Sequence, residues 1–275
     1  MNVGVRTVGA VPHVTLRGVS KIYPARGKNA AVHALGPVDL DLTRGEFFSI
    51  VGPSGCGKST ILDLLSGLGG PSEGEIRCNG MDVGGKVPAG VGVVFQDDAS
   101  FPWLTVRENA SFGLRHNGTD PAVIKERVDY FLNFVGLAKF ADAMPAQLSG
   151  GMRQRLCIVR TLVMKPDLII LDEPFGALDQ QTRFLMGDEL LRIWRETNAT
   201  IVLVTHSLDE AAILSDRIGV MSARPGRFLK FINTEWERER DSRNASTPRF
   251  GQITSELWSV LREESIKSMG RVEAR

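Results

Sequence analysis

The sequence predicts an α/β fold with a mostly parallel core sheet, an antiparallel β subdomain and an inserted helical subdomain. Three short apolar runs indicate the parallel sheet: Phe47–Val51, residues 168–171 and residues 201–204. They are apolar on both faces, as expected of strands that helices cover from both sides. Helical stretches separate them and polar residues follow them, so a ligand is expected at their carboxyl ends.

A glycine-rich loop follows the first of these strands. It reads, in order, Gly52, Pro53, Ser54, Gly55, Cys56, Gly57, Lys58, Ser59 and Thr60. Glycines let the backbone curl with its N–H groups turned inward, and the helix expected from about residue 61 points its positive end at the same place. Lys58 can then reach terminal phosphates, and the Ser59 hydroxyl can hold Mg²⁺. A glycine-rich turn can also be a tight connection only, but the full G-x-x-x-x-G-K-S pattern between a strand and a helix favours a phosphate-binding loop.

The antiparallel subdomain is expected around this loop. Residues 14–22 alternate loosely between apolar and polar, and residues 38–42 alternate strictly, which is typical of a strand with one buried face. After the first helix, residues 68–74 form a glycine-rich loop, and residues 75–78 and 91–95 are predicted strands.

The helical subdomain is expected at about residues 97–165. Its first part, residues 97–109, is predicted to be irregular and contains Phe101, Pro102 and Trp103. Apolar residues then follow the spacing i, i+3, i+4 and i+7, which predicts a helix; they are Val128, Phe131, Leu132 and Val135.

An acidic pair follows the strand over residues 168–171. Asp172 would lie at the sheet edge, where a carboxylate can hold Mg²⁺ directly or through water. Glu173 would point elsewhere, because side chains alternate along a strand, and is placed to orient or deprotonate an attacking water. Such a pair is common by itself, and it is the upstream loop that favours a functional interpretation.

A second candidate anion site begins at Ser149, Gly150 and Gly151, just before a predicted helix with one apolar face. Ser149 suits the N-cap, and the first N–H groups of a helix attract anions. The residues alone leave two interpretations equally open, an anion site or a capped helix and nothing more.

In combination, these motifs resemble those of ATP-binding-cassette (ABC) ATPases, which are P-loop NTPases. The motifs occur in the family's order at residues 52–60, Gln96, residues 148–155, 168–173 and 176–179, and His206. The resemblance covers residues 14–230. Residues 231–275 are expected to be a charged linker and a short C-terminal helix. This helix could pack on its own body, pack on another subunit or serve as a regulatory segment. It implies a head-to-tail homodimer that holds ATP between the loop of one copy and residues 149–151 of the other. The γ-phosphate would meet Lys58, Mg²⁺ and that helix only in the closed dimer.

The resemblance also implies roles for individual residues. Tyr23 is similar to the aromatic residue that stacks on adenine, although it could be an ordinary strand-edge tyrosine. Gln96 is similar to the residue that contacts Mg²⁺ and the attacking water and senses a membrane partner. Glu173 resembles the catalytic base, and His206 the switch histidine that contacts the γ-phosphate and positions Glu173. Asp179 resembles the residue that communicates across the dimer.

Several segments resemble importer ATPases for nitrate, taurine and alkanesulfonates. They are residues 94–96, 101–106, 108–109, 172–179, 181–183 and 221–227. The implied partners are a second copy of the chain, integral-membrane permease subunits and, indirectly, a solute-binding protein, with the chain peripheral on the cytoplasmic face of a bacterial inner membrane. Residues 101–103 would either pack internally or, as we favour, form an exposed apolar patch for a permease helix. Ser207 follows His206 at a position where the family usually has Asp. Val159 and Thr161 stand where the family usually has Ala. These differences bear on the substrate subclass more than on ATPase activity. Alternatives are another importer, an exporter, a soluble ABC ATPase and a non-catalytic nucleotide-binding regulator.

Composition weighs against several functions. The formal charge is +1, from 33 Lys and Arg against 32 Asp and Glu, so nothing indicates a nucleic-acid partner. No apolar run approaches the roughly 18 residues of a membrane span, and residues 1–12 lack the pattern of a secretory signal. The three cysteines are far apart, which favours a reducing compartment over disulfides or zinc. Since Cys56 lies inside the loop, we expect a bulky thiol reagent to block ATPase activity, and we expect bound ATP to protect the protein from this inhibition.

Overall fold

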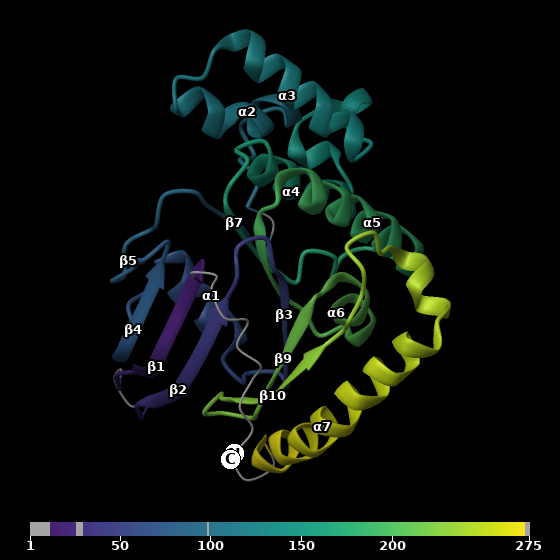
Figure 1. Cartoon of the computed structure of the whole chain (residues 1–275). Helices are drawn as coiled ribbons and strands as arrows, with labels where there is room; N and C mark the ends of the chain where they lie inside the picture. The colour runs from purple at the N-terminus through teal and green to yellow at the C-terminus, as the bar shows by residue number, and fades with distance from the viewer. Residues whose placement is uncertain (1–11, 26–29, 98, 273–275) are drawn as a thin grey trace.

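The computed structural model describes residues 12–25, 30–97 and 99–272, and it confirms the α/β class (Figure 1). The residues expected to lack a secretory signal fall almost entirely outside this part. Within it, the core sheet has six strands in the order β10-β9-β3-β8-β7-β6. Their bounds are β3 (Phe47–Val51), β6 (Val91–Val94), β7 (Leu168–Asp172), β8 (Thr200–Val204), β9 (Arg217–Met221) and β10 (Phe228–Asn233).

The core sheet is parallel except at β10, which pairs antiparallel with β9. All five residues of β3 and of β8 are buried, as their apolar sequences predict. In the register, Ile50 of β3 and Asp172 of β7 both pair with Val204 of β8, so these three strands end at one edge. Residues that follow these strands therefore meet there. The helices around the sheet include α1 (Lys58–Ser66), α5 (Gln180–Thr197) and α6 (Leu208–Leu214).

A second sheet, of four strands among the described residues, forms the expected antiparallel subdomain. Its order is β2-β1-β4-β5, from β1 (Val14–Tyr23), β2 (Val32–Leu42), β4 (Glu73–Cys78) and β5 (Met81–Asp82). Strand β2 is longer than the predicted residues 38–42. Its pairing with β1 is shifted at several points, and such irregularities break the apolar–polar alternation from which a strand is recognised.

The helical subdomain contains α2 (Val106–His116), α3 (Pro121–Phe134) and α4 (Gly150–Leu162), at the top of Figure 1. Helix α2 begins inside residues 97–109, so the prediction of an irregular segment is wrong over its last four residues. The start of α2 is fixed by a capping box: the Thr105 hydroxyl accepts from the Glu108 N–H, and the Glu108 carboxylate accepts from the Thr105 N–H.

The C-terminal helix is long, not short: α7 (Pro248–Val272) has 25 residues. Its first turns pack Ile253, Leu257 and Leu261 into a cluster with residues of β9 and α6, so it lies on its own body. Figure 1 shows it in yellow beside the edge of the core sheet. The apolar spacing ends at Leu261 while the helix continues, which is why the sequence underestimates its length. Strand β10 also crosses the boundary expected at residue 230. None of the described helices is both long and apolar enough to cross a membrane.

The segment between β10 and α7 was predicted to be a charged linker, yet Arg240 within it is buried, with 2% of its surface exposed. Its guanidinium lies 4.5 Å from the centre of the Trp194 ring. Nε donates to the Leu214 carbonyl oxygen at 3.1 Å, and Nη1 donates to Asp216 at 2.7 Å. This one side chain therefore fastens the C-terminal segment to α5 and to the end of α6.

We predict that Arg240→Ala lowers the free energy of unfolding by about 2 kcal/mol or more, because a buried carbonyl and a half-buried carboxylate lose their partner. Chemical denaturation monitored by circular dichroism measures the loss. Arg243→Ala is the matched control, since the Arg243 side chain is 88% exposed and pairs with its near neighbour Asp241. The control should change stability by less than about 0.5 kcal/mol. Equal losses in the two variants would contradict the role given to Arg240.

Candidate active site

An open pocket of about 600 Å³ lies at the edge where β3, β7 and β8 end. It brings together residues that are far apart in sequence, from the end of β1, the glycine-rich loop and the segments that follow β6 and β7. The lining residues are Tyr23, Val32, Ala34, Ser54, Gly55, Gly57, Lys58, Ser59, Thr60, Gln96, Glu173 and Arg224. Six of the nine predicted loop residues, with Tyr23, Gln96 and Glu173, thus line one cavity, whereas Gly52, Pro53 and Cys56 do not.

The glycine-rich loop forms a tight cradle between β3 and α1. Gly55 and Gly57 have φ angles of 72° and 107°, which side chains disfavour. A Cβ on Gly57 would lie 2.9 Å from the Ala34 carbonyl oxygen, so close packing also requires glycine there. The Lys58 ammonium donates to the carbonyl oxygens of Gly52 at 2.8 Å and Pro53 at 3.2 Å. It is thereby held over the loop, next to the helix N-terminus that attracts phosphate.

Asp172 and Ser59 bring two oxygen-bearing side chains into hydrogen-bond contact beside the loop. Burial is the main cause that raises the pKa of the Asp172 carboxyl; the Glu173 charge raises it further, and a hydrogen bond from the Ser59 hydroxyl opposes both. A hydroxyl and a carboxylate in contact with each other suit Mg²⁺, which is commonly held by one or two protein oxygens and phosphate. The donor set therefore fits the metal that the sequence predicts.

Glu173 stands at the centre of the site. Its φ of 47° is unusual for a residue with a side chain. Glu173 Oε2 accepts a hydrogen bond from Gln96 Nε2 at 3.0 Å and lies 3.2 Å from His206 Nδ1. Gln96 follows β6 and His206 follows β8, so residues from three strand ends converge on one oxygen atom.

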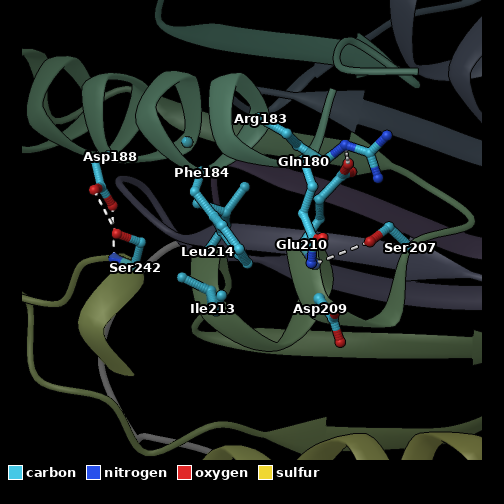
Figure 2. Close-up of a pocket in the computed structure, with 11 residues that line it drawn as sticks. Gln180, Arg183, Phe184, Asp188, Ser207, Asp209, Glu210, Ile213, Leu214 and Ser242 are labelled. Carbon is cyan, nitrogen blue, oxygen red and sulfur yellow. Dashed lines mark hydrogen bonds and ion pairs between the residues drawn. The ribbon is translucent and has the colours of Figure 1, made fainter. Parts of the chain in front are cut away.

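Glu210 of α6 stabilises the segment after β8, and Figure 2 shows its contact with Ser207 of that segment. The Thr205 hydroxyl donates to Glu210 Oε2 at 2.6 Å and accepts from the Ser207 N–H at 3.0 Å. Ser207 caps α6 by accepting from the Glu210 N–H at 3.3 Å. Serine and aspartate are both good N-caps, so the departure from Asp at this position preserves the capping function. His206 is thus flanked by two fixed residues.

Glu210 also contacts α5. Arg183 Nε lies 3.3 Å from Glu210 Oε1, and Arg183 Nη2 donates to the Leu178 carbonyl oxygen at 3.1 Å. Burial raises the pKa of the Glu210 carboxyl, while Thr205 and Arg183 oppose that rise. A cavity of about 240 Å³ lies beside this network, between α5, α6 and Ser242 (Figure 2). Glu210 was not predicted from the sequence, where it is marked merely by being an acidic residue three positions after a cap.

The other predicted site residues lie outside the pocket of this single chain. Ser149 is the N-cap of α4 and accepts from the Met152 N–H at 3.3 Å, with Gly150 and Gly151 in the first turn. Asp179 is the N-cap of α5 and accepts from the Thr182 N–H at 3.0 Å. The N-cap position of Ser149 matches the capped-helix interpretation, and an anion site would require the same helix start.

Cys56 is buried, with 1% of its surface exposed, and burial raises the pKa of its thiol. The expected inhibition by a thiol reagent stays a prediction, but the reaction will be slow because the thiol is little exposed and little of it is ionised to thiolate.

Residues 101–103 were predicted either to pack internally or to form an exposed apolar patch, and they do both. Phe101 packs against Phe112, with 4.6 Å between ring centres, while Trp103 is 69% exposed.

Thr161, another departure from the family pattern, is accommodated by its neighbours. Its hydroxyl donates to the Val93 carbonyl oxygen at 3.1 Å. Its methyl group occupies the space beside Gly92, where an added Cβ would lie only 2.6 Å away. Gly92 therefore leaves room for the larger side chain.

Comparison with known proteins shows the family to which the chain belongs. The family described as ABC transporter matches residues 35–176. The ATP-binding protein MJ0412 of Methanocaldococcus jannaschii is 41% identical over 254 residues, 92% of this chain and 93% of that protein. The taurine import ATP-binding protein TauB of Pelagibacter ubique is 43% identical over 250 residues, 89% of this chain and 93% of that protein.

Among solved structures, the ATP-binding cassette MJ0796, described as a dimer bound to ADP and Pi, superimposes with a TM-score of 0.73 at 31% identity. The match covers 82% of this chain and 100% of that one. Sequence and structural likeness extend through both sheets and the helical subdomain. The chain therefore belongs to the ABC transporter family, as one of its ATP-hydrolysing cassettes.

Proposed function

We propose that this chain is the nucleotide-binding subunit of an ABC importer and energises the uptake of a small anion, such as taurine, another aliphatic sulfonate or nitrate, through a membrane permease. ATP hydrolysis is supported by one observation: Gln96 and His206 both contact Glu173, beside the loop that holds Lys58. The import ATP-binding proteins similar to this chain support the transport part.

In this proposal, the loop N–H groups and the Lys58 ammonium bind the phosphates of ATP, and Tyr23 stacks on adenine. Ser59, Asp172 and Gln96 would hold Mg²⁺, which neutralises phosphate charge when bound. Lys58 already sits above the loop, so it exchanges carbonyl partners for phosphate oxygens without a large movement.

Glu173 is the proposed general base. It accepts a proton from the water that attacks the γ-phosphate, while Gln96 and His206 fix the carboxylate that both contact. His206 is 64% exposed at its side chain, which leaves it accessible to a γ-phosphate. Stabilisation of the transferring phosphoryl group is then mainly electrostatic and positional.

The proposed active form is a head-to-tail dimer. Ser149, Gly150 and Gly151 do not line the pocket of their own chain, although a capped helix start is suited to a phosphate. A second copy would supply them and close the site, and Asp179 at the start of α5 would lie near the boundary. The dimeric description of MJ0796 supports this arrangement.

The proposed permease contact is an aromatic patch in which Trp103 and Phe112 are exposed and the half-buried Phe101 packs against Phe112. Arg160 lies 4.7 Å from the Phe101 ring centre and donates to the Ala99 carbonyl oxygen, which fixes the patch to α4. The chain would then lie peripherally on the cytoplasmic face of the membrane, with a solute-binding protein acting on the other side of the permease.

We expect Glu173→Gln to retain ATP binding and to lower the hydrolysis rate by about 100-fold or more, since the amide cannot take the proton. It should also accumulate an ATP-bound dimer. Phosphate release, with size-exclusion chromatography in ATP and Mg²⁺, measures both effects. Glu196→Gln, an exposed change at the end of α5, serves as control. Near-normal turnover in Glu173→Gln would remove this residue as the base.

Lys58→Ala should weaken ATP binding about tenfold or more, because one charge-assisted contact to phosphate is lost. Equilibrium titration with a fluorescent ATP analogue in Mg²⁺ gives the dissociation constant. The exposed Lys139→Ala should bind like the unsubstituted protein. Equal affinity in all three proteins would contradict the assignment of the loop.

Trp103→Ala should weaken association with the permease about tenfold, as expected for an aromatic anchor in an interface, while the basal ATPase rate stays unchanged. Co-purification with the permease and permease-stimulated ATPase activity are the measurements. Trp258→Ala is the matched control, since Trp258 is 56% exposed but lies on α7. A loss in the control that equals the loss in Trp103→Ala would place the contact elsewhere.

A further inference from the structure

The loop over residues 222–227 connects β9 to β10 and packs directly against the phosphate loop. The Gly226 N–H donates to the Ala34 carbonyl oxygen at 2.9 Å, and the Gly36 N–H donates to the Gly226 carbonyl oxygen at 3.2 Å. A Cβ on Gly226 would lie 2.0 Å from the Cys56 carbonyl oxygen. Only glycine permits so close an approach between the two loops.

The same loop has a fixed internal shape. The Ser222 hydroxyl lies 3.2 Å from the Pro225 carbonyl oxygen, to which it donates, and it accepts from the Arg227 N–H at 3.1 Å. The Ser222 N–H donates to the Arg227 carbonyl oxygen at 2.9 Å. These bonds close the loop at its base, so the residues at its tip are held in one place.

Arg224 is at that tip and lines the pocket with Lys58 and Tyr23. Its Nε donates to the Gly55 carbonyl oxygen at 3.2 Å, and Nη2 would be 3.4 Å from a Cβ on Gly55. A guanidinium thus lies against the part of the loop that the sequence assigns to phosphate. A planar guanidinium matches phosphate oxygens well, since it can donate two parallel hydrogen bonds.

Helix α7 contacts the same loop through Glu264. This residue follows Leu257 and Leu261 on the buried face of the helix and is only 6% exposed. Its Oε2 accepts from the Ala223 N–H at 2.8 Å, and its Oε1 accepts from Lys267 Nζ at 2.5 Å. A carboxylate on an otherwise apolar face adds little packing, and its hydrogen bond from the Ala223 N–H links α7 to this loop.

We infer that Arg224 binds the phosphates of the nucleotide, and that α7 holds Arg224 in position through the bond from Glu264 to the neighbouring residue Ala223. The inference rests on the proposed nucleotide site and adds to it a residue and a helix. It makes the C-terminal helix a determinant of ATP affinity, although the helix does not line the pocket. Arg224 is the contacting residue, and Glu264 is a positioning residue.

The first test is titration of the full chain with a fluorescent ATP analogue in Mg²⁺. Arg224→Ala should weaken binding about tenfold, the value of roughly one charge-assisted hydrogen bond, and Arg224→Lys by less. Arg227→Ala is the matched control: it removes an arginine of the same loop that is exposed and does not line the pocket. Affinity of Arg224→Ala within twofold of the unsubstituted protein would overturn the inference.

The second test separates positioning from general stability. Glu264→Ala should weaken binding about threefold, whereas Glu264→Gln should bind normally, because its amide oxygen still accepts from the Ala223 N–H. The double variant Arg224→Ala with Glu264→Ala should bind no more weakly than Arg224→Ala alone, since Glu264 acts through Arg224. Additive losses would overturn the positioning role. If Glu264→Ala does not fold, Glu264→Asp, which shortens the reach, gives the same comparison.

Failure of this inference can be distinguished from failure of the proposed function. If Lys58→Ala loses affinity while Arg224→Ala does not, the nucleotide site stands and the role of Arg224 is wrong. If the unsubstituted chain does not bind the analogue, the proposed site and this inference are both wrong.

Discussion

The parallel register of β3, β7 and β8 is the constraint on which the site depends. Pairing of Ile50 and of Asp172 with Val204 ends the three strands at one edge, so the glycine-rich loop, Glu173 and His206 follow at neighbouring positions. The strands are buried, and a shift of register would move polar residues into the core. The energy that fixes the candidate site is therefore largely the energy of the apolar core, and its side chains need only local hydrogen bonds to complete it.

The backbone at Glu173 shows how those local bonds complete the site. A left-handed conformation costs about 1 kcal/mol or more and persists only when its surroundings impose it. The Glu173 N–H donates to the Val204 carbonyl oxygen, and its carbonyl oxygen accepts from the Gly176 N–H. The carboxylate then meets Gln96 and His206. An unfavourable conformation is thus held by both main-chain and side-chain contacts, as is common where a reactive group must point in one direction.

Much of this architecture was predictable from the sequence, because its signals are local. Apolar runs located β3, β7 and β8, and residue spacing located the phosphate loop and the acidic pair. Strands β9 and β10, the full length of α7 and the burial of Arg240 were not predicted. Their signals are non-local: Gly219 in β9 makes room for Phe228 and Phe48, and Arg240 is buried only because Trp194 and Leu214 surround it. The contact of Glu210 with Arg183 and that of Arg224 with Gly55 were not predicted either, because in each pair the two residues are distant in sequence.

The seating of the C-terminal segment on α5 and α6 bears on how this cassette can be recombined. A chimaera joined at residue 230 would split β10 and separate Arg240 from the Trp194 face that it covers. Tryptophan and backbone carbonyls shielded in the parent protein would then be exposed in the hybrid. Exchange of cassettes between transporters should therefore carry the tail along with the body, as a single transplantable unit.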